Sequence, residues 1–397
     1  MAISSLERRV IEDIREGEVV ELLRELIQQR SDYPPGDTRG VIEVIASRLR
    51  EAGVPYQCYA CREHQLSLVA TYPTGRNRRC LLAHAHVDTV PAGEIERWSG
   101  DPFSGERRQG RVYGRGAGDD KGSVAAQVAA LLALKRAGVE LRGVFQVAAV
   151  ADEESGGEQG TRWLRQEGVL KPDALLVGEQ TNNHVAIAER VACGIDLTVY
   201  GKSAHGAMPW AGENAVLKAA GALTWLREHL LPDLAKRQHR YLPPPTLNIG
   251  KITGGIQWSI VPERCKVEMD RRLLPGETRD QAMEEIRQAL DEYNELVEEL
   301  DYELFSSGDV APNINTPPDD TFVTAAQEAL RDLSGETRPL AGYVQTSDGR
   351  WFAGDGIPII LFGPGDPALA HAADEFVEVG QVVEAARALA VIAMRWR

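Results

Sequence analysis

The first part of the chain alternates between helical and strand-like hydrophobic patterns. Apolar side chains recur at helical spacing over residues 5–31 and 38–52, and prolines and glycine near residue 35 separate these two segments. Four aliphatic runs of strand length follow, at 66–72, 78–87, 143–151 and 173–179, with helical patterns near 120–137 and 160–167 between them. Strands that alternate with helices predict an α/β domain whose sheet is mixed, mostly parallel and flanked by helices.

The pattern changes near residue 186 and changes back after Pro312. In between, polar and apolar positions alternate over 193–202, 246–253 and 264–273, and helical patterns cover 213–231 and 278–299. This is typical of an α+β domain with an antiparallel sheet. The α/β pattern then resumes with a helix near 320–333, a strand at 357–364 and a helix near 379–396. We therefore predict one domain formed by residues 1–187 and 305–397, with a second domain, residues 188–304, inserted into it.

The composition excludes several classes of partner. The 397 residues are 43% hydrophobic and carry a net charge of −15, so nucleic acid and anionic membrane surfaces are disfavoured. No apolar run reaches the ~20 residues that span a bilayer, and the first residues alternate charged with aliphatic side chains, unlike a secretory signal. An odd count of five cysteines suits a reducing compartment, and we interpret the C-x-x-C pair Cys58 and Cys61 as a coincidence. These features predict a cytoplasmic protein.

Acidic and histidine side chains follow almost every aliphatic run of the first domain. The carboxyl ends of parallel strands meet at one edge of a sheet, so we expect these side chains to lie together. They are His86 and Asp88 after the run 78–87, Asp152, Glu153 and Glu154 after 143–151, Glu179 after 173–179, and His371 after 357–364, with Asp119 and Asp120 in the turn GRGAGDDKG.

Taken singly, each of these patterns has an ordinary explanation. An H-x-D triplet or a pair of glutamates is common in surface turns, and the glycine-rich turn lacks the spacing of a phosphate loop. Together they would bury several unpaired carboxylates, which is costly unless cations offset the charge. Mixed imidazole and carboxylate ligands suit zinc, cobalt or manganese better than calcium or magnesium. We therefore predict a site for two divalent metal ions, with zinc preferred.

A series of longer motifs carries a family resemblance over nearly the whole chain. In order they are HVDTVPAG, GRVYGRGAGDDKG, ADEESGG, LLVGEQT, GKSAHGAMP, LNIGKITGG, MDRRLLPGET, TSDGRWF and AHAADEFV. This series resembles the dizinc amidohydrolases and exopeptidases that include acetylornithine deacetylase, succinyl-diaminopimelate desuccinylase, aminoacylase-1 and glutamate carboxypeptidase. The resemblance implies that the first domain is catalytic, and that the inserted domain is a lid that forms a homodimer.

The resemblance also assigns roles at the metal site. Asp119 would bridge the two ions, with His86 and Glu179 on one ion and Glu154 and His371 on the other. Asp88 would accept the second N–H of His86 and fix its tautomer. Glu153 would be the general base that generates a metal-bridging hydroxide and later protonates the leaving amine.

Substrate contacts follow from the same resemblance. His205 would stabilise the oxyanion, often from the partner subunit, while Arg272 and Asn248 would hold a substrate carboxylate, with hydrogen bonds from Thr346 and Ser347. Arg271 competes with Arg272, but the D-x-R spacing from Asp270 favours Arg272. The chain departs from the family pattern at Gln180 and Gln345, which bear on substrate identity, and at His84, which lies on the same side of its strand as His86.

The predicted function is hydrolysis of the amide bond of an N-acyl amino acid or related small carboxylate. A dipeptidase or carboxypeptidase needs the same residues and is the main alternative. A carbamoyl-amino-acid amidohydrolase, a two-metal phosphatase and a metal-binding protein without activity are less favoured, the last because no ligand or base is missing.

Overall fold

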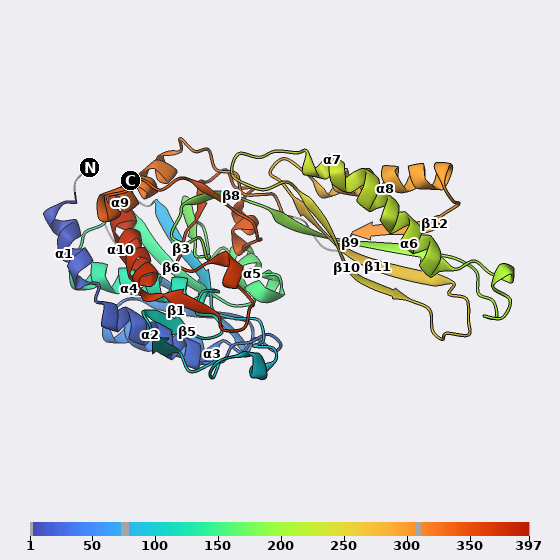
Figure 1. The fold of residues 1–397 in the computed structure, drawn as a ribbon. Coiled ribbons are helices and arrows are strands. Elements are labelled where there is room, and N and C mark those ends of the chain that lie inside the picture. Colours follow the sequence, from blue (N-terminus) through green and yellow to red (C-terminus); the bar gives the residue numbers. More distant parts are fainter. Residues whose placement is uncertain (1–2, 73–78, 307–310, 397) are drawn as a thin grey trace. The chain divides into compact units, whose positions relative to one another are not determined.

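The computed structural model describes residues 3–72, 79–306 and 311–396, and the chain divides into two compact units (Figure 1). Unit 1 comprises residues 1–187, 315–341 and 347–397, and unit 2 comprises residues 188–314 and 342–346. The sequence patterns predicted that the inserted domain covers residues 188–304. Arg78, the first residue of a predicted strand, lies outside the described residues.

An eight-stranded sheet forms the centre of unit 1. Its order is β1 (Tyr56–Arg62), β2 (Gln65–Tyr72), β6 (Val144–Val150), β3 (Cys80–His86), β7 (Ala174–Val177), β14 (Ile359–Leu361), β8 (Ala186–Glu189) and β13 (Ala341–Tyr343). Strands β6, β3, β7 and β14 run parallel, whereas β1, β2 and β8 pair antiparallel with their neighbours. The prediction of a mixed sheet with a parallel centre is confirmed.

The parallel strands are buried along almost their whole length. All seven residues of β3 and all four of β7 are buried, which explains their uninterrupted apolar sequences. Their carboxyl ends lie at one edge, since His86 pairs with Val150 at the end of β6 and His84 pairs with Val177 at the end of β7. The polar residues that follow these strands therefore start from neighbouring positions.

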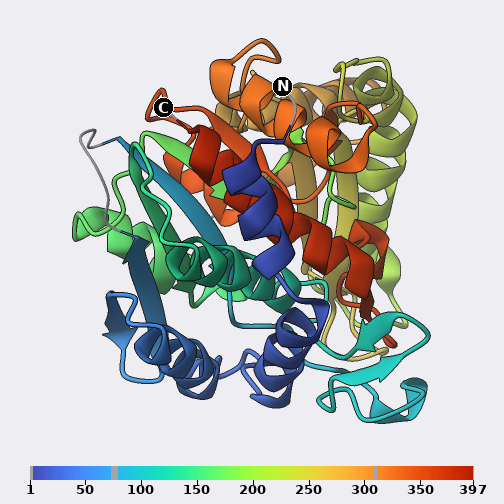
Figure 2. The same cartoon turned by 90° about the vertical axis from the view of Figure 1, so that its left-hand side faces the viewer.

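Helices surround this sheet. They are α1 (Ser5–Asp13), α2 (Glu16–Gln28), α3 (Arg39–Glu51), α4 (Lys121–Arg136), α5 (Trp163–Gln166), α9 (Thr321–Ser334) and α10 (Val379–Arg395). Figure 2 shows α1, α4 and α10 packed beside one another, and α4 also contacts β3 and β6. Because α4 lies between the sheet and these outer helices, it is buried nearly all round.

The helical pattern predicted over residues 5–31 is divided between two helices. The backbone is extended at Ile14 and Arg15, where α1 ends and α2 begins. Neither residue is proline or glycine, so the periodic pattern runs through the break without a signal. The two helices pack on different neighbours, α1 mainly on α10 and α2 mainly on α4, and this packing accounts for the change of direction.

Unit 2 is a four-stranded antiparallel sheet with helices on one face. The strand order is β10 (Thr246–Gly254), β11 (Arg264–Leu273), β9 (Val191–Tyr200) and β12 (Asp301–Ser306), and the helices are α6 (Ala215–Trp225), α7 (Leu231–Ala235) and α8 (Arg279–Leu296). Buried and partly exposed residues alternate strictly along β11, as expected for a sheet with one covered face. The buried residues of β9 and β11 form a core with α6 and α8.

A small sheet brings the end of the chain close to the glycine-rich turn. Its strands are β15 (Phe376–Glu378), β5 (Arg111–Tyr113) and β4 (Glu106–Arg108), in that order. Phe376 pairs with Tyr113, so the segment after His371 runs beside the segment before Asp119. No helix in the described part of the chain is long and apolar enough to cross a membrane, and all five cysteines are free thiols.

Candidate metal centre

Three of the predicted ligands form one group at the carboxyl edge of the sheet. His86 is the last residue of β3, Asp119 lies two residues before the start of α4, and Glu179 lies two residues after the end of β7. One potential ligand atom from each lies within 4.8 Å of the others, and all three side chains are buried. His86 Nε2 lies 2.9 Å from Asp119 Oδ1.

A second group shares Asp119 with the first. His371 Nε2 lies 3.3 Å from Asp119 Oδ2 and 3.3 Å from Glu154 Oε2. The ligand atoms of Asp119, Glu154 and His371 again lie within 4.8 Å of one another. The two carboxylate oxygens of Asp119 therefore face different histidines, which is the arrangement a carboxylate needs to bridge two ions.

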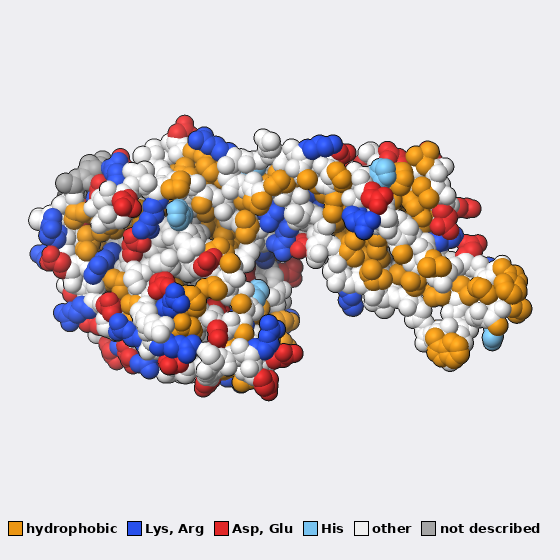
Figure 3. Space-filling view, in the orientation of Figure 1, with side chains coloured by type: hydrophobic (Ala, Val, Ile, Leu, Met, Phe, Trp, Pro, Cys, Tyr) orange, Lys and Arg blue, Asp and Glu red, His pale blue; other side chains and the backbone are white. Residues whose placement is uncertain are grey.

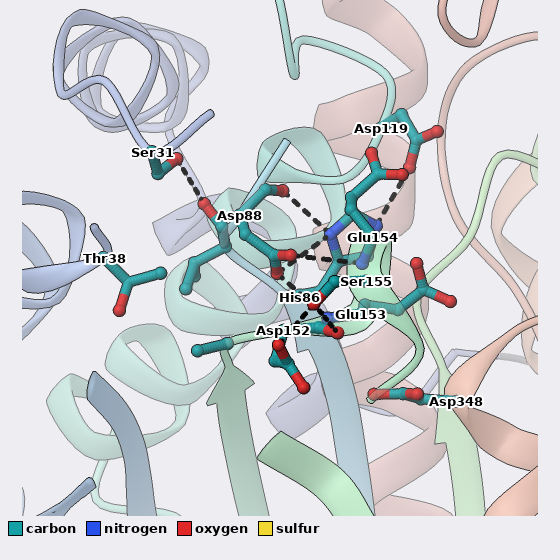
Figure 4. Close-up of polar contacts among 12 residues, drawn as sticks. Ser31, Thr38, His86, Asp88, Asp119, Asp152, Glu153, Glu154, Ser155 and Asp348 are labelled. Carbon is teal, nitrogen blue, oxygen red and sulfur yellow. Dashed lines mark hydrogen bonds and ion pairs between the residues drawn. The ribbon is translucent and has the colours of Figure 1, made fainter. Parts of the chain in front are cut away.

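Asp88 holds the turn that carries Glu153 and Glu154 (Figure 4). Its Oδ1 accepts a hydrogen bond from Glu153 N at 3.2 Å, and its Oδ2 accepts one from Glu154 N at 3.1 Å. The contact to His86 Nδ1 comes from the main-chain oxygen of Asp88 at 2.9 Å, whereas the carboxylate is 3.7 Å away. The expected carboxylate contact is thus replaced by a carbonyl, because the carboxylate faces the turn. The carbonyl also leaves Nε2 free to face the cluster.

Asp152 supports the same turn from its other side. Its backbone is left-handed, with φ of 78°, and its carboxylate accepts hydrogen bonds from Gln65 Nε2, Ser155 Oγ and Gln159 N. Figure 4 shows Asp88 and Asp152 bracketing the segment that begins at Glu153. The general-base candidate is therefore carried by a turn whose backbone is fixed by two carboxylates.

The titration behaviour of the site reflects a surplus of acidic groups. Burial and neighbouring carboxylates raise the pKa of Glu179 and of Glu153 well above the ordinary range. Hydrogen bonds to Asp119 and Glu154 raise the pKa of His371 to about 10. Burial opposes the charge of His86, yet the contact with Asp119 raises its pKa. Bound divalent cations would stabilise these carboxylates as anions, so the donor set fits two metal ions of the zinc type.

His84 belongs to a separate buried network and to neither ligand group. Its Nε2 lies 2.7 Å from Thr161 Oγ1, and Thr161 donates its hydroxyl proton to Asp348 Oδ2 at 2.6 Å. Since that hydroxyl has a single proton, His84 Nε2–H must be the donor to Thr161. Burial lowers the pKa of His84 to about 4, which keeps the ring neutral.

Two substrate candidates come together in unit 2. Arg272 Nη1 lies 3.3 Å from Thr346 Oγ1, and its Nε lies 2.9 Å from Asp270 Oδ2. The neighbouring Arg271 is 1% exposed and donates to Glu277 at 3.2 Å. Successive residues of a strand point to opposite faces, so Arg272 is available to a ligand and Arg271 is engaged in the fold.

The other substrate candidates differ in their exposure. Asn248 is exposed on β10 and pairs in register with Asp270. His205 lies on an exposed loop of unit 2, where its Nδ1 accepts from Ala207 N at 3.0 Å. Ser347 belongs to unit 1, is fully buried and accepts from Gly349 N.

The sequence interpretation overlooked Arg190. Its guanidinium donates to the main-chain oxygens of Val344 and Pro244, and burial together with the charge of Arg272 lowers its pKa. Arg190 and Arg272 therefore lie close enough for their charges to interact, and the Asp270 carboxylate acts on both. The only sequence signal was a basic residue directly before β9.

Comparison with known proteins agrees with this geometry. Residues 82–395 match the family described as peptidase family M20/M25/M40. A succinyl-diaminopimelate desuccinylase from Methylobacterium radiotolerans is 32% identical over 382 residues, covering 91% of this chain and 92% of that protein.

Solved structures share the fold. The M20 family metallo-carboxypeptidase Sso-CP2 from Sulfolobus solfataricus superposes with a TM-score of 0.76 at 18% identity, covering 95% of this chain and 99% of that one. The YXEP protein of Bacillus subtilis, a dinuclear metal binding peptidase, gives 0.71 at 16% identity, covering 96% and 97%. With the family match over most of its length and both ligand groups in place, the chain is a metal-dependent amide hydrolase that belongs to peptidase family M20/M25/M40.

Proposed function

We propose that this protein hydrolyses the amide bond of an N-acyl amino acid or a related small carboxylate. The observation that carries the proposal is the pair of ligand groups that share Asp119 beside Glu153. The similarity to a desuccinylase, which by its name removes a succinyl group, supports a deacylase.

The roles of the ligands and the base follow from their positions. His86 and Glu179 would hold one ion, Glu154 and His371 the other, and Asp119 both. Bound divalent cations supply an activated water and polarise the amide carbonyl. Glu153 accepts the proton of the attacking water, whose oxygen bonds to the acyl carbon. As the C–N bond breaks, Glu153 returns the proton to the amine nitrogen. The carboxylates of Asp88 and Asp152 accept hydrogen bonds from backbone N–H groups of the segment that begins at Glu153, and so keep this turn in place.

Arg272 is the candidate for the substrate carboxylate. Its guanidinium is partly exposed and is oriented by Asp270 and Thr346, which suits bidentate recognition of a carboxylate. Asn248 would help to hold the same carboxylate, and Thr346 would add a hydrogen bond. Ser347 is fully buried, so its predicted contact with the substrate is not supported. Arg190, beside Arg272, adds positive charge to the same end of unit 2.

The roles that we propose for unit 2 and for His205 involve a homodimer. We propose that unit 2 is a lid and dimerisation domain and that His205 stabilises the oxyanion, in the same or the partner subunit. Figure 3 shows hydrophobic side chains gathered at one end of unit 2. The most exposed ones in this unit include Trp258, Ile256 and Trp210, at 95%, 89% and 80%. A light-scattering mass of one chain with full activity would contradict the role in trans.

Zinc is the metal we propose, with cobalt and manganese as substitutes, because each group combines one histidine with two carboxylates. Five free thiols and no disulfide are consistent with a cytoplasmic location.

A carboxypeptidase or dipeptidase is the second candidate, and the structural likeness to a metallo-carboxypeptidase favours it. Both reactions need the same base and carboxylate clamp and differ in the acyl side of the substrate.

A substrate panel separates the two. Purified protein loaded with zinc or with cobalt is incubated with N-acetyl, N-succinyl and N-formyl amino acids and with dipeptides, and amine release is measured. We expect turnover of an N-acyl amino acid to exceed that of the dipeptides. Preferential dipeptide cleavage would support the second candidate, and no amine release from any of these substrates by the metal-loaded protein would contradict both.

A further inference from the structure

A buried carboxylate that is not a ligand connects the two segments that contribute Asp119 and His371. Glu375 lies four residues after His371 and is 1% exposed. Its Oε1 accepts hydrogen bonds from Gly118 N at 2.9 Å and from Asp119 N at 3.1 Å. Its Oε2 accepts from Gly116 N at 3.2 Å and from the guanidinium of Arg115.

The loop before Asp119 is therefore folded around one side chain. Three backbone amides of residues 116–119 converge on Glu375, and Gly114 N donates to its main-chain oxygen. Gly116 has φ of 84° and Gly114 has φ of 152°, values that L side chains rarely adopt. Because Asp119 N is itself a donor, the contact fixes the backbone of the residue whose carboxylate faces both histidines.

The same carboxylate also anchors the segment of His371. That histidine is exposed, with 52% of its side chain accessible, and its φ is 63°. The buried side chain of Glu375 holds the chain in place shortly after His371. Arg115, which is only 2% exposed, forms an ion pair with Glu375 and balances its charge. Glu375 therefore acts on the segments of two candidate ligands. Asp119 belongs to both ligand groups, whereas His371 belongs only to the group of Asp119, Glu154 and His371.

We propose that Glu375 is a positioning residue that sets the metal affinity of the site, most strongly for the Asp119, Glu154 and His371 group. This inference rests on the proposed two-metal function. Groups that orient metal ligands without binding the ion typically change affinity by about 10–100-fold when removed. We expect a loss of that size for Glu375→Ala. Glu375→Gln keeps one acceptor for the loop amides but directs N–H groups at Arg115 or the loop, so its loss should be smaller.

A purely structural role would lower stability without changing metal affinity, and Glu7 provides the matched control. Glu7 is also buried, at 7% exposure, and accepts from Arg395 Nε at 2.7 Å and from Ser4 N at 2.7 Å, neither of which belongs to a ligand residue. Glu7→Gln should lower the melting temperature of the metal-free protein and leave zinc affinity at the wild-type value.

The experiment measures zinc stoichiometry and affinity by competition with a chromophoric chelator, together with the melting temperature of each metal-free variant. Weaker binding of at least one zinc equivalent in Glu375→Gln and Glu375→Ala, with normal binding in Glu7→Gln, supports the proposal. If Glu375→Ala fails to fold, Glu375→Gln alone decides. Wild-type affinity for both equivalents in a folded Glu375 variant overturns it. Amide hydrolysis is assayed on the wild-type samples, so that two bound metals without turnover contradict the proposed function alone.

Discussion

The two units present their functional side chains in different ways. In unit 1 the candidate ligands His86, Asp119 and Glu179 are buried, and carboxylates fix the backbone around them. In unit 2 His205 and Asn248 are exposed, and Arg272 is partly exposed. A cluster of like charges must be built rigidly, since each displaced carboxylate would be left buried and unpaired. Groups that meet a substrate need access to it, and the exposed residues of unit 2 have that access. We propose that unit 1 holds the metal ions and the general base, and that unit 2 contributes substrate contacts.

Metal removal is expected to have the largest effect. Dialysis against a chelator should abolish amide hydrolysis and lower the melting temperature, because the carboxylates of unit 1 lose the cations that offset their charge. Adding zinc, cobalt or manganese should restore both. Measuring activity and melting temperature on the same samples checks this, and full activity with no bound metal would contradict the assignment of the site.

Replacing the general base should remove most turnover while metals stay bound. We expect Glu153→Gln to lower kcat by about 10²–10⁴-fold, the usual contribution of a positioned general base, with two zinc equivalents retained. Glu158→Gln is the control, because Glu158 is an exposed residue of the same region paired with Arg162. Normal turnover in a metal-loaded Glu153→Gln protein would rule out its role.

Arg271 and Arg272, which are adjacent on β11, test whether substrate binding and stability depend on different residues of unit 2. Arg272→Met should raise KM by about 10–100-fold, the cost of roughly 1.5–3 kcal/mol for a charged hydrogen bond, with little change in melting temperature. Arg271→Met should leave KM unchanged in any protein that folds. It should lower the free energy of unfolding by about 1.5–3 kcal/mol, because Glu277 loses the contact with Arg271 but keeps its contact with Arg237. Steady-state kinetics and urea denaturation of both variants provide the measurements. A raised KM in Arg271→Met and a loss of stability in Arg272→Met would contradict both assignments.

A smaller effect is expected in the pH dependence of the unfolding free energy of the metal-free protein. The pKa of His371 is raised to about 10 from 6.5, so its stabilising contribution is complete below about pH 6.5 and is lost as the pH rises toward 10. The raised pKa values of Glu153 and Glu179 act with the same sign, since the folded state holds their protons more tightly. The unfolding free energy of the metal-free protein should therefore fall between about pH 6 and about pH 9.

Zinc should make that decline shallower, because bound ligands cannot be protonated. Urea denaturation with and without zinc across this range gives the comparison. Parallel curves with and without zinc would show that these groups do not contact the metal.

Much of unit 1 could be predicted because its elements are signalled locally. Uninterrupted aliphatic runs predicted β3, β6 and β7, and the polar residues at their ends include the candidate ligands. The short strands β8, β13 and β15 were not predicted, whereas β7, which is also only four residues long, was marked by the aliphatic run that contains it. The break at Ile14 and the contact of the Asp88 carboxylate with the Glu153 turn also escaped prediction, because both depend on neighbours distant in sequence.

The sequence by itself determined the two-unit organisation, the parallel strands and the set of histidines and carboxylates, because periodicity and residue chemistry are local properties. The tertiary structure decided which oxygens of Asp119 face which histidine, that His84 is held by Thr161 rather than facing a metal, and that Arg271 is buried while Arg272 is accessible. It also revealed Glu375 as the partner of the loop before Asp119. These outcomes depend on hydrogen bonds between segments up to about 260 residues apart, whose directions are set only when the whole sheet edge has assembled.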